Sequence, residues 1–280
     1  MSFNITKETA WCPGCGNLSI RQALKKALDE LDLSTDDLLV SAGIGQAGKL
    51  PQFIDVNAFA GLHGRALPVA IGMKLSNHKM KVLVSGGDGD SLGEGGNHLI
   101  HAIRRNIDIV QLVHDNQVYG LTKGQASPTT PQGQKAAMSY TGSRPYPMHP
   151  LTLALTMGAG FVARGFAGDI EGLKEIIKEA LKFRGYAIID ILQPCPSWNK
   201  INTFQWYKER VKPLGDDYDP TDFNKAYELS LKWEDEIPTG ILYKKERPIY
   251  EENFSFINGD ALVDRKLDPK DAQVLIDDLR

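Results

Sequence analysis

Hydrophobic positions repeat with two different spacings along residues 1–200, and the two spacings alternate. Short apolar runs rich in β-branched residues predict buried strands at residues 38–42, 82–84, 107–114, 161–164 and 186–192. Apolar residues at helical spacing predict helices at residues 18–31, 66–75, 92–105, 151–157 and 170–183. Because strands alternate with helices, we expect an α/β fold with a doubly wound, mostly parallel sheet.

The alternation ends near Asn199, and the rest of the chain is charged, with scattered aromatic side chains. Such a segment can hardly bury itself alone. We therefore expect two parts, an α/β domain over residues 1–200 and an irregular C-terminal extension over residues 201–280. The extension is expected to pack on the core and on a partner chain.

The stretch from Lys81 to Gly120 organises the chain. Its first predicted strand ends in a glycine turn that contains Asp88, and its second is followed by Asn116. Carboxyl ends of neighbouring parallel strands meet at one edge of a sheet, so both side chains are expected at that edge. Hard oxygen ligands beside exposed backbone amides suit an Mg²⁺ ion that holds a diphosphate. The stretch therefore predicts a magnesium–diphosphate site.

Gly87-Asp88-Gly89 followed by Asn116 resembles the fingerprint of enzymes that use thiamine diphosphate (TPP). The resemblance implies that Asp88, Asn116 and the backbone carbonyl of Val118 bind Mg²⁺. An ordinary doubly wound nucleotide-binding domain with a glycine turn is the alternative interpretation of this stretch.

Composition narrows the class of protein. The chain has 280 residues, 42% hydrophobic content, three cysteines and a formal net charge of −3. This charge is too close to neutral to indicate a nucleic-acid or anionic-membrane surface. No apolar run approaches the ~20 residues of a membrane span, and the N-terminus lacks an apolar signal core. We expect a cytoplasmic protein whose cysteines serve metal or redox chemistry rather than a disulfide framework.

Two cysteines lie in the sequence Cys12-Pro-Gly-Cys15, and Asn17 can cap the helix that follows. A lone pair with this spacing is typical of structural zinc, a dithiol or an iron–sulfur cluster. A dithiol favours a thioredoxin-like unit after a strand, which is absent here, so the pattern favours a metal or a cluster. Cys195, between two prolines at a predicted strand end, is expected to join the Cys12/Cys15 loop.

Two further segments are candidates for the same sheet edge. Lys49 ends a glycine turn after the strand at 38–42 and can place its ammonium there, although a solvated lysine is the alternative. His63 can donate to a phosphate or a developing oxyanion, although a structural role is at least as common for a histidine. The polar loop over residues 119–130 is expected to cover a ligand.

The ordered motifs resemble the β subunit of a 2-oxoacid:ferredoxin oxidoreductase over nearly all of residues 9–210. They are WCPGCGN at 11–17, GIGQAGK at 43–49, HGR at 63–65, GDGD at 87–90, GGNHLIHAIRRN at 95–106, DNQVYGLTKGQ at 115–125 and DILQPCPSWN at 190–199. The expected cofactor contacts are Gly45, Gly48, His63, Gly64, Arg65, Gly87, Asp88, Gly89, Asp90, Asn116, Val118, Gly120, Leu121 and Thr122.

The resemblance implies a 4Fe–4S cluster bound by Cys12, Cys15 and Cys195. The family's fourth cysteine corresponds to Gln46, whose neutral carboxamide is a poor substitute for a thiolate on iron. One iron bound by water or another ligand, a 3Fe–4S form and a partly unstable cluster all remain open. A cluster is favoured over zinc.

The resemblance also implies the chemistry. TPP attacks the 2-oxo carbon, CO₂ leaves, electrons pass through the cluster to ferredoxin, and coenzyme A takes the acyl group. His63 and Lys49 are the candidate catalytic residues, with Lys49 as a contact for the substrate carboxylate. The glutamate that activates TPP belongs to a separate domain, so an α subunit is implied.

We expect 2-oxoglutarate as the substrate, ahead of pyruvate. Its second carboxylate needs a second cation, and Lys49, Lys123 and Arg65 are available. Two other classes stay open, a TPP-dependent decarboxylase or transferase subunit without a functional cluster and a non-catalytic binding subunit.

Overall fold

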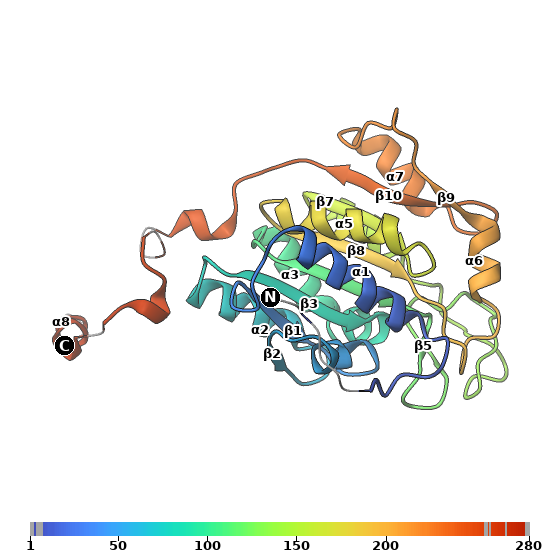
Figure 1. Cartoon of the computed structure of the whole chain (residues 1–280), viewed down its shortest axis with the longest axis horizontal. Coiled ribbons are helices and arrows are strands. Elements are labelled where there is room, and N and C mark those ends of the chain that lie inside the picture. Colours follow the sequence, from blue (N-terminus) through green and yellow to red (C-terminus); the bar gives the residue numbers. More distant parts are fainter. Residues whose placement is uncertain (1–2, 4–7, 255–256, 258, 267, 278–280) are drawn as a thin grey trace.

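Parallel strands form the centre of the computed structural model, which describes residues 3, 8–254, 257, 259–266 and 268–277 (Figure 1). The described residues form an eight-stranded sheet in the order β2-β1-β3-β4-β8-β7-β10-β9. Six strands run parallel, and β10 is antiparallel to β7. The sheet strands are β1 (Leu38–Ala42), β2 (Asn57–Ala60), β3 (Lys81–Gly87), β4 (Val110–Asp115), β7 (Phe161–Phe166), β8 (Ala187–Leu192), β9 (Val211–Pro213) and β10 (Ile237–Lys244).

Helices cover both faces of the sheet. The α-helices are α1 (Gly16–Glu30), α2 (Ala66–Ser76), α3 (Gly96–Arg105), α4 (Pro150–Thr156), α5 (Ile170–Lys182), α6 (Phe204–Arg210), α7 (Phe223–Leu231) and α8 (Pro269–Asp277). One core cluster joins α1 and α5 to one face, and a second joins α2, α3, α4 and α7 to the other. The expected doubly wound α/β fold is confirmed.

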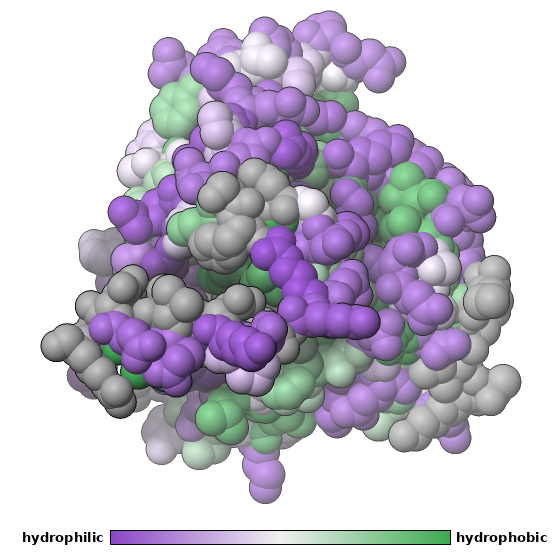
Figure 2. Space-filling model, turned by 90° about the vertical axis from the view of Figure 1, so that its left-hand side faces the viewer, coloured by the Kyte–Doolittle hydropathy of each residue, from purple (hydrophilic) through white to green (hydrophobic). Residues whose placement is uncertain are grey.

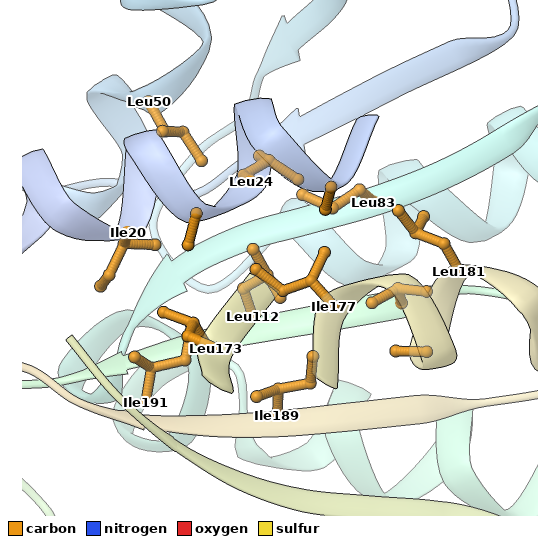
Figure 3. Packing of buried hydrophobic residues seen from close by; sticks show 14 of the residues in the cluster. Ile20, Leu24, Leu50, Leu83, Leu112, Leu173, Ile177, Leu181, Ile189 and Ile191 are labelled. Carbon is orange, nitrogen blue, oxygen red and sulfur yellow. The ribbon is translucent and has the colours of Figure 1, made fainter. Parts of the chain in front are cut away.

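Alternation along each strand divides the core between the two faces. Leu83 belongs to the cluster under α1 and α5, whereas Val82 and Val84 belong to the cluster on the opposite face. Figure 3 shows Leu83 packed with Leu24 of α1 and Ile177 of α5. Each fully buried side chain of this kind stabilises the fold by roughly 1.5–3 kcal/mol. Burial on both faces explains why these strands are continuous apolar runs in the sequence.

The main difference from the expected elements follows the glycine turn. A helix was expected from residue 92, but the chain first forms one turn of π-helix, η2 (Gly89–Glu94), and α3 begins at Gly96. Single π turns of this kind occur frequently at functional sites. The turn sets the backbone direction directly after Asp88.

Regular elements also form in the C-terminal extension, where the sequence pattern predicted none. The strand β10 pairs with β7, and β9 pairs with β10. Arg164 of β7 is buried and donates hydrogen bonds to the carbonyl oxygens of Ser230 (3.0 Å), Lys232 (3.4 Å) and Pro238 (3.4 Å). A buried guanidinium therefore ties this part of the extension to the sheet. The boundary near residue 200 stays a prediction.

After β10 the chain leaves the body of the molecule and ends in α8, the element farthest from the sheet (Figure 1). Figure 2 views this end of the molecule and shows a mostly hydrophilic face with small hydrophobic patches. In the part of the chain that the structure describes, no helix has both the length and the apolar character to cross a membrane.

Candidate functional site

A cavity of about 220 Å³ lies beyond the carboxyl ends of β1, β3, β4 and β8. The strand register creates it, because Gly87 pairs with His114 and Asp115 pairs with Leu192, so the loops that follow start at one edge. The cavity is lined by the predicted residues Gly45, His63, Gly87, Asp88, Gly89, Asp90, Asn116, Val118, Gly120, Leu121, Thr122, Cys12, Cys15 and Cys195.

Five candidates are not among the described residues that line this cavity, namely Gly48, Lys49, Gly64, Arg65 and Lys123. Lys49 is half-buried in the short helix η1 (Ala47–Phe53). Gly48 packs on the backbone of the preceding turn, where a Cβ atom would lie 1.7 Å from the Gly43 oxygen. Arg65 is exposed and lines a separate cavity. The structure therefore places no lysine or arginine in the described lining.

Asp88 is 1% exposed and is held by two hydroxyl groups. Its Oδ2 atom accepts hydrogen bonds from Ser127 Oγ (2.5 Å) and Thr129 Oγ1 (2.6 Å). Burial raises the pKa of Asp88, and both hydrogen bonds oppose the shift by stabilising the carboxylate. The loop after β4 thus fixes the orientation of a carboxylate at the end of β3.

Asp90 binds the backbone of two neighbouring turns. Its Oδ1 atom accepts hydrogen bonds from the Ile44 amide (3.0 Å) and the Gly64 amide (2.8 Å). His63 Nδ1 lies 3.0 Å from the same atom and 3.2 Å from Glu94 Oε2. Asp90 therefore orients the His63 ring at the cavity wall.

Asn116 connects the carboxylate side of the cavity to the cysteines. Its Oδ1 atom accepts from the Val118 amide (3.1 Å), and its Nδ2 atom donates to Gln193 Oε1 (3.3 Å). Gln193 Nε2 lies 3.5 Å from Cys15 Sγ. Gln193, a cavity residue absent from the expected set, bridges the two halves of the site.

The three cysteines come together as expected from the sequence. The Gly16 amide donates to the Pro194 carbonyl (3.2 Å), which brings the Cys12/Cys15 loop beside Cys195. Burial raises the pKa of Cys15 to about 11, and the neighbouring Cys195 and Cys12 also raise it. Among the described residues, no three His, Cys, Asp or Glu side chains form a group suited to a single metal ion. The thiols share a cavity without forming a compact site for one ion.

Asn17 does not cap α1, so that prediction is wrong. The helix begins at Gly16 after Cys15, and Asn17 is buried within the first turn. Its Oδ1 atom lies 2.7 Å from His114 Nδ1, so Asn17 joins α1 to β4. The side chain serves the sheet edge instead of the helix terminus.

The loop over residues 119–130 covers part of the cavity. Tyr119, Gly120, Leu121 and Thr122 line it, and a Cβ atom at Gly89 would lie 2.3 Å from the Tyr119 ring. Glycine at position 89 therefore allows the loop to close on the turn. Trp198 also lines the cavity, and it lies in the motif at 190–199 but was not among the expected contacts.

Two family models match the chain. "Thiamine pyrophosphate enzyme, C-terminal TPP binding domain" matches residues 41–191, which include the glycine turn, Asn116 and β8. A model of the C-terminal part of the pyruvate ferredoxin oxidoreductase beta subunit matches residues 195–259, which include Cys195 and β10. Together the models include most of the cavity lining and most of the described extension, whereas Cys12 and Cys15 lie before the first match.

Curated and solved relatives agree with these matches. The chain is 46% identical to "2-oxoacid:ferredoxin oxidoreductase subunit beta" of Sulfolobus sp, over 91% of this chain and 88% of the relative. It is 42% identical to "2-oxoglutarate oxidoreductase subunit KorB" of Mycobacterium tuberculosis, over 70% of this chain and 53% of the relative. A structure of 2-oxoglutarate:ferredoxin oxidoreductase from Magnetococcus marinus, with 2-oxoglutarate, coenzyme A and succinyl-CoA bound, is 35% identical, with a TM-score of 0.91 and coverage of 99% of this chain and 96% of that chain.

Proposed function

We propose a specific chemistry for this chain, which belongs to the family of 2-oxoacid:ferredoxin oxidoreductase β subunits. As the β subunit, it holds Mg²⁺–TPP at the carboxyl edge of the sheet and an iron–sulfur cluster beside it. The observation that carries the proposal is one cavity lined by Asp88, Asn116 and all three cysteines. With an α subunit, ferredoxin and coenzyme A, it converts a 2-oxoacid to an acyl-CoA.

The donor atoms fit both groups. Asp88 and Asn116 supply hard oxygen atoms and Val118 a backbone carbonyl, the ligand chemistry that Mg²⁺ prefers. Cys12, Cys15 and Cys195 line the same cavity, and cysteine thiolates are the ligands that hold iron–sulfur clusters. Bound TPP supplies the carbanion chemistry for decarboxylation, and the cluster supplies one-electron transfer.

The chain's own residues position these groups and line the reaction space. Ser127 and Thr129 hold the carboxylate of Asp88 by hydrogen bonds, and Asp90 holds the His63 ring in the cavity wall. The His63 ring is then available to donate to a phosphate or a developing oxyanion. An apolar part of the cavity wall is formed by the side chains of Ile44, Leu121 and Trp198. These side chains limit the access of water to the reacting centre.

We propose 2-oxoglutarate as the substrate, because several curated relatives and the Magnetococcus marinus structure carry that name. A second carboxylate needs a cation. Since Lys49, Arg65 and Lys123 are not among the described lining residues, the α subunit is the proposed source of that cation. The C-terminal extension is the proposed contact surface for the partner.

Replacement of the central carboxylate tests the cofactor site. Asp88→Asn keeps the side-chain volume but removes the anionic ligand, and should weaken Mg²⁺-dependent TPP binding by at least about 100-fold. Asp36→Asn changes an exposed carboxylate outside the cavity and serves as the control. Isothermal titration on the αβ complex measures the affinity, and a thermal melt checks folding. Unchanged TPP affinity in Asp88→Asn would contradict the magnesium site.

Steady-state kinetics test the substrate. The purified αβ complex, assayed anaerobically with coenzyme A and ferredoxin, should show a higher kcat/KM for 2-oxoglutarate than for pyruvate, because a cation placed for the second carboxylate stays unpaired with pyruvate. A kcat/KM for pyruvate equal to or above that for 2-oxoglutarate would refute the choice. Both acids are measured on one preparation, so the cluster content is the same.

A further inference from the structure

Gln46 lies at the cysteine end of the cavity. It follows the glycine turn after β1 and lines the cavity together with Cys12, Cys15 and Cys195. Its backbone carbonyl accepts a hydrogen bond from the indole Nε1 of Trp11 (2.8 Å). Trp11 is the residue directly before Cys12. The Trp11 ring in turn packs edge-on against Phe53, with ring centroids 4.7 Å apart. The backbone of Gln46 is therefore fixed beside the Cys12/Cys15 loop.

The side-chain carboxamide oxygen of Gln46 lacks a partner. The Oε1 atom is buried from solvent and accepts no hydrogen bond from the described residues. The amide nitrogen Nε2 of the same side chain is not left buried without a partner in this way. A buried acceptor without a partner is unfavourable, because the hydrogen bonds that it makes with water in the unfolded chain are not replaced. Gln193, which lines the same cavity, directs its amide toward Asn116 and Cys15 and makes no hydrogen bond to the Gln46 oxygen. The oxygen is therefore free to bind a partner from outside the chain.

The surroundings indicate the class of that partner. Three thiols whose charges affect one another lie in the same cavity, and each becomes a metal ligand on deprotonation. A carboxamide oxygen is also a metal ligand, though harder and weaker toward iron than a thiolate. Three sulfur atoms and one oxygen atom supply four donors, which matches the four corners of a 4Fe–4S cluster.

We propose that Gln46 Oε1 ligates the iron that the three cysteines leave free, so that the cluster has three thiolate corners and one oxygen corner. The proposal rests on the cluster assignment made above. Since the oxygen bond is the weakest of the four, that iron leaves first. Removal of one electron, taken here by ferricyanide, and one Fe²⁺ from a 4Fe–4S cluster of charge 2+ gives a 3Fe–4S cluster of charge 1+.

Oxidative iron loss tests the ligand without reference to activity. The αβ complex is reconstituted anaerobically as wild type and as Gln46→Ala, Gln46→Cys and Gln52→Cys. Gln52 is an exposed residue of η1 outside the cavity, so Gln52→Cys controls for an added thiol. Each protein is treated with ferricyanide, and EPR follows the appearance of the oxidised three-iron cluster.

The proposal predicts an order of stability. Gln46→Cys should lose iron about tenfold more slowly than wild type, and Gln46→Ala about tenfold faster, whereas Gln52→Cys should match wild type. Mössbauer spectra should show one distinct iron in wild type and four equivalent thiolate-bound irons in Gln46→Cys.

Each other outcome counts against the ligand. Equal rates of iron loss in wild type and Gln46→Ala would show that the Gln46 oxygen does not bind iron. Equal rates of iron loss in wild type and Gln46→Cys would also contradict a weak oxygen ligand. A cluster present in Gln46→Cys but absent from wild type would also overturn it. Absence of iron and sulfide from both proteins would overturn the cluster itself, while TPP titration would still report on the magnesium site separately.

Discussion

Thr129 places one hydroxyl group between two buried carboxyl groups. Its Oγ1 atom lies 2.6 Å from Asp88 Oδ2 and 2.7 Å from Asp115 Oδ1. A hydroxyl carries one proton, so Thr129 can donate only one of these hydrogen bonds. Burial and the charge of Asp190 raise the pKa of Asp115 well above its usual range. Burial also raises the pKa of Asp88, but the hydroxyls of Ser127 and Thr129 stabilise its carboxylate. We therefore expect the Thr129 proton to be donated to Asp88, the proposed ligand of Mg²⁺.

Loss of this hydroxyl should weaken the proposed magnesium site. Thr129→Val keeps the side-chain shape but removes the hydroxyl group between the two carboxyl groups. The substitution should lower Mg²⁺ affinity by about 10–100-fold, which is the usual effect of losing a group that orients a metal ligand. Thr129→Ser retains the hydroxyl and should stay within a fewfold of wild type. Titration of Mg²⁺ at saturating TPP provides the measurement. Equal Mg²⁺ affinity in Thr129→Val and Thr129→Ser would show that the hydroxyl has no such role.

His114 joins three elements around the base of the site. Its ring lies 2.7 Å from Asn17 Oδ1 in α1 and 3.2 Å from Ser85 Oγ in β3, while the residue itself belongs to β4. The ring is fully buried, and burial lowers the pKa of His114 to about 3. The elements are thus held by a neutral imidazole.

This arrangement predicts a pH dependence of folding. As pH falls from 6.5 toward 3, the unfolded chain binds a proton at this residue and the folded chain does not, so stability decreases by up to about 1.4 kcal/mol per pH unit. His114→Gln removes the titrating imidazole, so the variant should lose the part of the pH dependence of folding stability that His114 causes. Urea unfolding of the apo chain between pH 4 and pH 7 measures the difference. Buried carboxyl groups with raised pKa values contribute the opposite slope, but equally in both proteins. Parallel stability curves would contradict the assignment.

Most elements of the domain could be predicted from the sequence, because their burial leaves a clear pattern. The strand β8 and the helix α5 match the expected ranges within a residue or two. The pattern could not reveal β10, whose half-buried residues and Gly240 interrupt the apolar run. Nor could it reveal η2, since helix periodicity alone does not distinguish a π turn from an α turn.

The candidate site was predictable where a residue follows a strand directly. Asp88, Asn116 and Cys195 come within three residues of a strand end, so the sheet geometry alone brings them together. Lys49 and Arg65 could not be placed in this way, because a short helix and a turn decide where they point. Ser127 and Thr129 lie in a loop without periodicity, and no sequence signal connects them to Asp88.

On the scale of the molecule, the proposed function divides the catalytic centre between two subunits. No glutamate is among the described residues that line the cavity, and the proposal takes the group that activates TPP from the α subunit. The isolated chain should therefore bind Mg²⁺–TPP but show no 2-oxoacid oxidation. Anaerobic dye-reduction assays, run with the α subunit and without it, measure this difference. Substrate-dependent dye reduction by the isolated chain would contradict it.

The position of β8 between β4 and β7 also determines the order of assembly. Strands β1 to β4 can pair as soon as residues 38–115 have been synthesised, but the free edge of β4 stays open until residues 187–192 emerge. An open apolar edge of this kind invites pairing with other chains. Cys12 and Cys15 leave the ribosome early, yet Cys195 follows β8. Loading of the proposed cluster is therefore expected to be a late event, and a chain truncated before residue 187 should aggregate before its first two thiols bind metal.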